Sequence, residues 1–188
     1  MKLIAEHIHI RPLGIEDAEE LLELRMVNRE FLRPFEPIQT EAHYTLDVQR
    51  EIISKSSHDW EQGMSYGFGV FQNDTNELIG RVNLSNVVRG AWQSCTLGYF
   101  MDHHQNGQGF MTEAVRLVLE FAFEHNNLHR VQAAVMPRNL PSIRVIEKSG
   151  FLFEGLAKYY LHINGVWEDH NVYSLTREFW KRESMNGR

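Results

Sequence analysis

Cysteine is nearly absent from this chain of 188 residues, and no apolar run reaches the length of a membrane span. The single cysteine, Cys95, excludes an internal disulfide and a cysteine-pair metal site, so we interpret it as a small buried apolar residue. The first residues also lack the continuous apolar segment of a signal peptide. We therefore expect a soluble, cytoplasmic protein with no membrane partner.

Positive charge is scarce in the first 75 residues, which hold seven lysines and arginines against fourteen acidic residues. The rest of the chain holds twelve against eleven, and the net charge is −6. Direct nucleic-acid binding is not expected, because its affinity depends on neutralising phosphates. The distribution predicts that the first part favours a cationic partner and that the second can accept an anion. Acidic helices that only keep the protein soluble are the alternative.

Hydrophobic periodicity predicts one domain, residues 1–188, with a mixed sheet and helices on both faces. We expect strands over residues 7–12, 66–71, 78–84, 92–101, 130–136, 151–162 and 166–176. Helices are expected over residues 14–28, 46–61, 110–125 and 141–148. Residues 28–37 contain Pro34 and Pro37, which predict an extended loop at the mouth of a substrate site.

A glycine-bracketed turn, Gln105 to Met111, precedes the helix expected over residues 110–125. Gly107 and Gly109 allow backbone N–H groups to approach a ligand, and the helix directs its positive end to the same point. The turn therefore predicts a phosphate or pyrophosphate site, with an ordinary connection as the alternative. It lacks the third glycine of a dinucleotide fingerprint and the Gly-Lys-Ser/Thr of a P-loop.

The order of these elements and two motifs resemble the Gcn5-related N-acetyltransferases, the GNAT family. The turn Asn106-Gly107-Gln108-Gly109-Phe110-Met111 keeps the central glycine of the family's Gln/Arg-x-x-Gly-x-Gly/Ala pattern but differs at both ends, and Met111 is expected to narrow it. The segments Asn139-Leu140-Pro141-Ser142 and Lys148-Ser149-Gly150-Phe151 match the second motif. The resemblance implies an α/β fold with a mixed, mostly antiparallel sheet of six to seven strands and a splay between the fourth and fifth. It also implies acetyl-CoA as co-substrate and no metal.

Within that family the chain is most similar to the RimJ type of ribosomal-protein-alanine N-acetyltransferases. The matching blocks include Phe31 to Pro37, Ser85 to Gly90, Leu97-Gly98-Tyr99 and Asn164 to His170. The resemblance implies transfer of acetyl to the N-terminal alanine of a basic ribosomal protein, with ribosomal-particle association as a further expectation. Acetylation of a small amine or polyamine is one alternative, and a non-catalytic module that binds acetyl-CoA or ribosomal particles is another.

The resemblance also implies roles for residues on the cofactor side. Asn139 would contact the pantetheine, and Ser142 would protonate the leaving thiolate, unless it only caps its helix. Backbone groups near Tyr99, Phe100 and Met101 would hold the thioester carbonyl. The pyrophosphate would lie over Gln105, Asn106, Gly107, Gln108, Gly109, Phe110, Met111 and Thr112.

The acceptor side lacks an obvious base. Some relatives carry a glutamate on the strand after Gly155, but the residue at that position is Leu161 here. A strong base is not needed for an α-amine, whose reference pKa of about 7.7–8.0 lies well below the value of about 10.4 for lysine. Glu36 is the first choice for contacting the amine, with a solvated loop residue as the alternative. Asn83, Tyr160 and His162 are expected to hold a water that relays the amine proton, and Phe35 and Trp167 are the other residues expected on this side.

Overall fold

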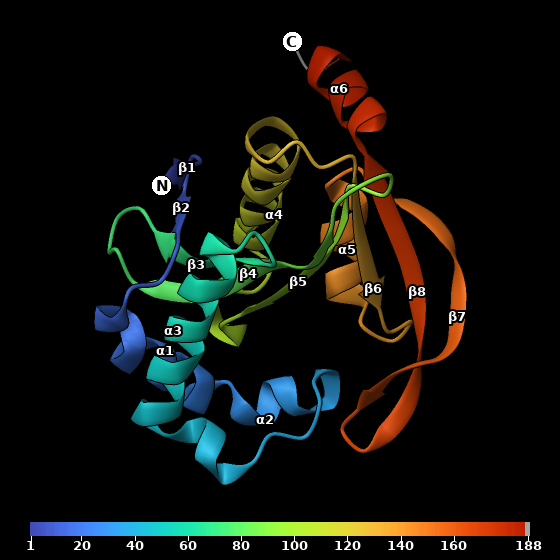
Figure 1. Cartoon of the computed structure of the whole chain (residues 1–188). Helices are drawn as coiled ribbons and strands as arrows, with labels where there is room; N and C mark the ends of the chain where they lie inside the picture. The colour runs from blue at the N-terminus through green and yellow to red at the C-terminus, as the bar shows by residue number, and fades with distance from the viewer. Residues whose placement is uncertain (187–188) are drawn as a thin grey trace.

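The computed structural model describes residues 1–186, and its centre is an eight-stranded sheet in the order β1-β2-β3-β4-β5-β6-β8-β7 (Figure 1). Only β5 and β6 pair in parallel, so the prediction of a mixed, mostly antiparallel sheet is confirmed. The strands are β1 (Leu3–Ile4), β2 (Ile8–Arg11), β3 (Tyr66–Gln72), β4 (Leu78–Val88), β5 (Ser94–Met101), β6 (Arg130–Val135), β7 (Leu152–Ile163) and β8 (Val166–Thr176). The expected count of six to seven is exceeded because the two-residue β1 is too short to give a periodic signal.

Helices cover both faces of the sheet, as expected (Figure 1). On one face α4 (Phe110–Glu120) packs against β2 and β4, with α5 (Leu140–Lys148) beside it on β6. On the other face α1 (Ala18–Val27) packs against β4, and α3 (Leu46–Glu61) packs against β3. Two buried apolar clusters fill these interfaces. Cys95 belongs to the first cluster and is 2% exposed, which confirms its interpretation as a buried residue. Burial raises the pKa of its thiol to about 12.

The segment between α1 and α3 is more helical than the prolines predicted. Asn28 is followed by α2 (Arg29–Leu32) and by a 3₁₀ turn over Arg33–Phe35, so the expected extended loop over residues 28–37 is wrong. Pro34 lies in the first positions of that turn, where a missing N–H removes no hydrogen bond. Glu36, the residue before Pro37, is extended.

The chain also departs from the expected elements at two helix ends. The helix expected over residues 110–125 finishes in a π turn at Phe121–His125. A helix that periodicity did not predict, α6 (Arg177–Asn186), follows β8. Among residues 1–186, no helix combines the length and apolar character needed to cross a membrane.

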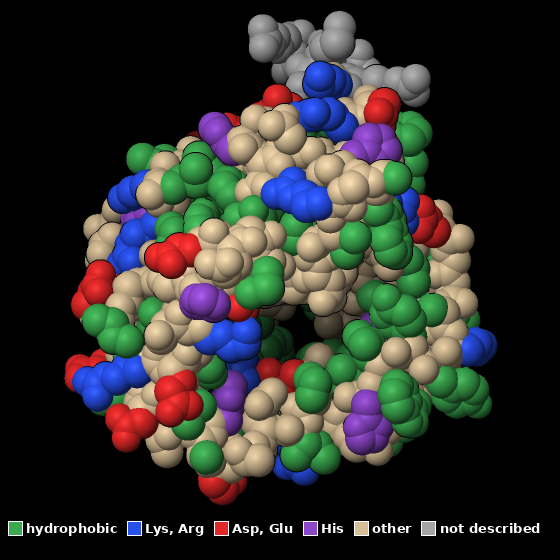
Figure 2. Space-filling model, viewed as in Figure 1, with side chains coloured by type: hydrophobic (Ala, Val, Ile, Leu, Met, Phe, Trp, Pro, Cys, Tyr) green, Lys and Arg blue, Asp and Glu red, His purple; other side chains and the backbone are tan. Residues whose placement is uncertain are grey.

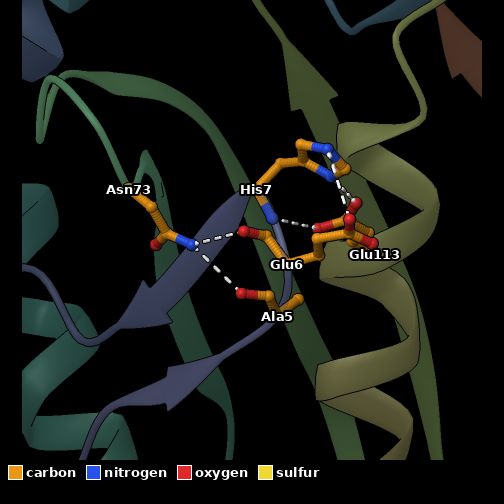
Figure 3. Close-up of polar contacts among 5 residues, drawn as sticks. All are labelled: Ala5, Glu6, His7, Asn73 and Glu113. Atoms are coloured by element: carbon orange, nitrogen blue, oxygen red, sulfur yellow. Dashed lines mark hydrogen bonds and ion pairs between the residues drawn. The ribbon is translucent and has the colours of Figure 1, made fainter.

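The segment between β1 and β2 is fastened to the first turn of α4 (Figure 3). The His7 backbone N–H donates to Oε2 of Glu113 at 3.1 Å, and its ring Nδ1 lies 2.7 Å from Oε1. The Asn73 amide donates to the carbonyl oxygens of Ala5 and Glu6 at 3.0 and 3.1 Å. These contacts hold the start of α4, and with it the glycine turn, against the sheet.

The His7–Glu113 pair gives a pH-dependent prediction. The hydrogen bond to Glu113 is the main cause that raises the pKa of His7 above its ordinary value of 6.5. The contribution of the charged pair to stability is therefore complete below pH about 6.5 and is lost as the pH rises through the raised value. Glu113→Gln should lower the His7 pKa measured by NMR and destabilise the protein more at pH 5.5 than at pH 8.5. Glu124→Gln, on the exposed side of the π turn, is the control; an unchanged His7 pKa in Glu113→Gln would refute the prediction.

Candidate functional site

The two parallel strands separate halfway along their length. β5 and β6 pair from Ser94 with Arg130 as far as Leu97 with Ala133. Beyond this point β5 continues along β4 to Met101, while β6 continues along β8. One backbone edge of Gly98–Met101 is therefore left without a strand partner. The expected splay is confirmed, because β5 and β6 are the fourth and fifth of the expected strands.

The glycine turn is open above its backbone. Gly107 and Gly109 have φ angles of +82° and +89°, and a Cβ atom at either position would meet nothing within 4 Å. Gly109 is the N-cap residue of α4, whose first-turn N–H groups have no partner within the helix. Left-handed backbone, open space and free donors at a helix N-terminus fit a pyrophosphate.

The side chains around this turn point away from that space or are tied to one another. Met111 is 6% exposed and packs beneath Gly80, so the expectation that it narrows the turn is wrong. Phe110 is also buried, so both residues present only backbone to the turn. The Gln108 side-chain amide donates to Oε1 of Gln105 at 3.0 Å. Asn106 is exposed and Thr112 is half-buried in the first turn of α4.

Two hydroxyl groups meet beside the splay. The Tyr99 hydroxyl on β5 lies 2.7 Å from Oγ of Ser142 on α5 and donates to the Ser142 carbonyl oxygen at 3.1 Å. The Asn139 side chain is the cap of α5, since its Oδ1 accepts from the Ser142 N–H. The capping alternative for Ser142 is therefore wrong, and its hydroxyl is free to act with Tyr99.

The Tyr99–Ser142 hydroxyl pair can supply a proton. Burial raises the pKa of Tyr99 well above its ordinary value, and the hydrogen bond with Ser142 opposes this only in part. The phenol therefore stays protonated near neutral pH. Only the backbone of Tyr99 was predicted to act, because no pattern in the sequence brings its side chain to a helix 43 residues later.

On the acceptor side, Glu36 is tied into the structure. Both of its carboxylate oxygens accept from Arg25 at 2.8 Å, and the arginine side chain is only 7% exposed. The Glu36 carbonyl oxygen accepts from the Asn164 N–H in the β7–β8 turn at 3.0 Å, and Arg138 donates to the Pro34 carbonyl oxygen at 3.1 Å. The alternative of a solvated loop residue is wrong for Glu36. Sequence reasoning missed Arg25, because a lone arginine on an amphipathic helix gives no signal.

These contacts join the residue 33–37 segment to the β7–β8 hairpin through Asn164 and to the β6–α5 connection through Arg138. A hollow lies on this face of the molecule. Figure 2 shows the hollow at the centre of this face, below β5 and above α2 in the view of Figure 1, with charged and apolar side chains on its rim. A cavity of about 230 Å³ is lined by Glu36, Arg29, Arg33 and Tyr44 among others, and one of about 400 Å³ includes Trp167.

The remaining predicted acceptor residues fall into two groups. Tyr160 packs on His170, and His162 on the exposed Trp167, so this group lies on the β7–β8 hairpin. Asn83 lies on β4 opposite Gly98, next to the splay, and Phe35 packs near Phe31 in the segment that contains Glu36. The structure thus places the first group on the β7–β8 hairpin and the second on β4 and the residue 33–37 segment.

One group of potential metal ligands occurs within residues 1–186. The ligand atoms of Asp102, His103 and His104 lie within 4.8 Å of one another. The His103 ring Nδ1 is 2.7 Å from Oδ1 of Asn28, and the Asp102 carboxylate accepts from the His104 N–H. Two of the three side chains already have protein partners, so this geometry gives no reason to assign a metal.

The chain matches known proteins over nearly its whole length. Residues 7–152 match the family model of the acetyltransferase (GNAT) domain. A probable N-acetyltransferase of Bacillus subtilis, YjcK, is 48% identical over 89% of this chain and 93% of its own. The ribosomal protein uS5-alanine N-acetyltransferase of Escherichia coli is 34% identical over 96% of this chain and 93% of its own.

A solved structure agrees with these sequence matches. Mycobacterium smegmatis RimJ, in complex with CoA-disulfide, superposes with a TM-score of 0.88 at 29% identity, over 96% of this chain and 90% of its own. The residues that match the family model include the splay and the glycine turn. The chain therefore belongs to the GNAT family of N-acetyltransferases and is homologous to its RimJ-type members.

Proposed function

We propose that the enzyme transfers acetyl from acetyl-CoA to an N-terminal α-amine, with the N-terminal alanine of a ribosomal protein as acceptor. The observation that carries the proposal is the Tyr99–Ser142 hydroxyl pair beside the unpaired edge of Gly98–Met101. The relatives named as ribosomal-protein-alanine N-acetyltransferases support the choice of acceptor. We also propose that residues 1–188 form one catalytic domain, because all eight strands belong to one sheet.

In this mechanism acetyl-CoA supplies an activated acetyl thioester. The N–H groups of Gly107 to Thr112 bind the pyrophosphate, and the open edge at Tyr99 to Met101 stabilises the carbonyl oxygen as it becomes negative. The neutral amine attacks the carbonyl carbon, the new C–N bond replaces the C–S bond, and water accepts the amine proton. The Tyr99–Ser142 pair gives a proton to the leaving thiolate.

The charges around the acceptor cavities favour this acceptor over a polyamine. The smaller cavity is lined by Arg29 and Arg33 as well as by Glu30 and Glu36. A pocket selective for a polycation would instead present mainly carboxylates. The mixed lining fits a peptide end that carries one amine and a polar backbone.

Thiol release from acetyl-CoA tests the proposal with three acceptors. These are a basic peptide with an N-terminal alanine, the same peptide with a blocked N-terminus and a free lysine, and spermidine. We expect release with the free α-amine only. Release with spermidine alone would assign the enzyme to small-amine acetylation. Binding of acetyl-CoA with no release from any acceptor would favour a non-catalytic module.

A further inference from the structure

Two arginines, Arg25 and Arg81, lie beneath the acceptor side, near the carboxylate of Glu36. Arg25 pairs with Glu36, whereas the Nε atom of Arg81 on β4 is buried without a hydrogen-bond partner. Burial, and secondarily the charge of Arg25, lower the pKa of Arg81 to about 10. Arg81 is therefore still charged at neutral pH, and a buried charge is costly unless an opposite charge compensates it.

A histidine completes this arrangement. The His43 Nε2 atom is buried without a partner, as are the Nε atoms of Arg25 and Arg81. Burial, followed by the charge of Arg25, lowers the pKa of His43, with Arg81 acting in the same direction and Glu36 in the opposite one. The Arg25–Arg81 cluster, which also includes Glu36 and His43, thus carries two guanidinium groups, a neutral imidazole and one carboxylate. The net charge of these four side chains is therefore +1.

The cluster lies next to the reaction centre. Arg81 is the cross-strand partner of Phe100, so the two side chains share the face of the sheet that α1 and α3 cover. The Arg25 guanidinium lies 4.9 Å from the centre of the Phe100 ring. Phe100 belongs to the open edge at the splay, and Glu36 lines the acceptor cavity. An acceptor amine at the splay would place its neighbouring residue within reach of the cluster.

We propose that the Arg25–Arg81 cluster binds a carboxylate of the acceptor, carried by the residue that follows the N-terminal alanine. A monoanion matches the single excess charge, and the planar arginine fork suits a carboxylate. This inference rests on the proposed function, because it assumes a peptide acceptor.

Peptide binding to the CoA-saturated enzyme tests the site without turnover. Two basic peptides that begin Ala-Asp and Ala-Asn, otherwise identical, would be titrated by calorimetry. We expect the aspartate peptide to bind about tenfold more tightly, in line with a charge-assisted hydrogen bond. Arg81→Met should abolish this preference, Arg81→Lys should retain part of it, and Arg50→Met on the exposed face of α3 should retain all of it.

The wild-type comparison already decides the inference, even if an Arg81 variant does not fold. Equal binding of the two peptides, or tighter binding of the asparagine peptide, would overturn it. Thiol release with the same peptides and acetyl-CoA reports separately on the proposed function. Selective binding without thiol release would support the carboxylate site and refute the α-amine acceptor. Thiol release without selective binding would support the α-amine acceptor and refute the carboxylate site.

Discussion

Tyr99→Phe is expected to lower kcat by about a hundredfold, within the range known for general acid catalysis, and to leave the Kd of acetyl-CoA nearly unchanged. The substitution removes the phenolic proton but keeps the ring in its half-buried position on β5. Ser142→Ala removes the other half of the hydroxyl pair and should reduce kcat to a similar extent. Because the two groups share one hydrogen bond, the reduction in kcat of the double variant should be smaller than the product of the two single reductions.

Steady-state kinetics and CoA titration of the three variants check this prediction. Ser57→Ala, on the exposed surface of α3, is a matched control that should leave kcat unchanged. A loss below threefold in both single variants would show that the pair does not deliver the proton. A loss in affinity rather than in kcat would assign it to cofactor binding.

Gly109→Ala is expected to weaken CoA binding at least tenfold. The residue has a φ angle of +89°, which costs a non-glycine residue about 1–2 kcal/mol, and its new methyl group would enter the open space above the turn. Strain alone would destabilise the protein, so the control must carry the same strain. Gly90→Ala serves this purpose, because Gly90 has a φ angle of +70° and equally open surroundings in the β4–β5 turn.

Calorimetric titration with CoA and thermal unfolding separate the two effects. Both variants should lose stability, but only Gly109→Ala should lose affinity. Equal Kd values for the wild type and Gly109→Ala would show that the turn does not bind the pyrophosphate. A matching loss in Gly90→Ala would show that general destabilisation explains the change.

The parts of the site that local sequence can specify were predicted correctly. Glycines at 107 and 109, followed by an amphipathic helix, indicated an open turn at a helix N-terminus, and both lie in left-handed backbone there. The parallel crossover was predicted because a strand, a helix and a strand follow one another along the chain. Such features depend on neighbouring residues, so one sequence is enough to identify them.

Contacts between distant residues were not predictable. Tyr99 and Ser142 are 43 positions apart, and nothing local distinguishes Tyr99 from a packing residue on a strand. The partner of Glu36 was missed because the sequence does not show which of several arginines in the first part of the chain forms the ion pair with it. Only the packing of α1 on β4 selects Arg25. The residues that complete the acceptor side therefore depend on tertiary structure.

The most direct test of the central claim is the position of the acetyl group on one peptide. A basic peptide with an N-terminal alanine and an internal lysine would be incubated with enzyme and acetyl-CoA, then sequenced by tandem mass spectrometry. The account predicts a single acetyl group on the α-amine of the alanine. An acetyl group on the lysine side chain, or an unmodified peptide in the presence of bound acetyl-CoA, would contradict it.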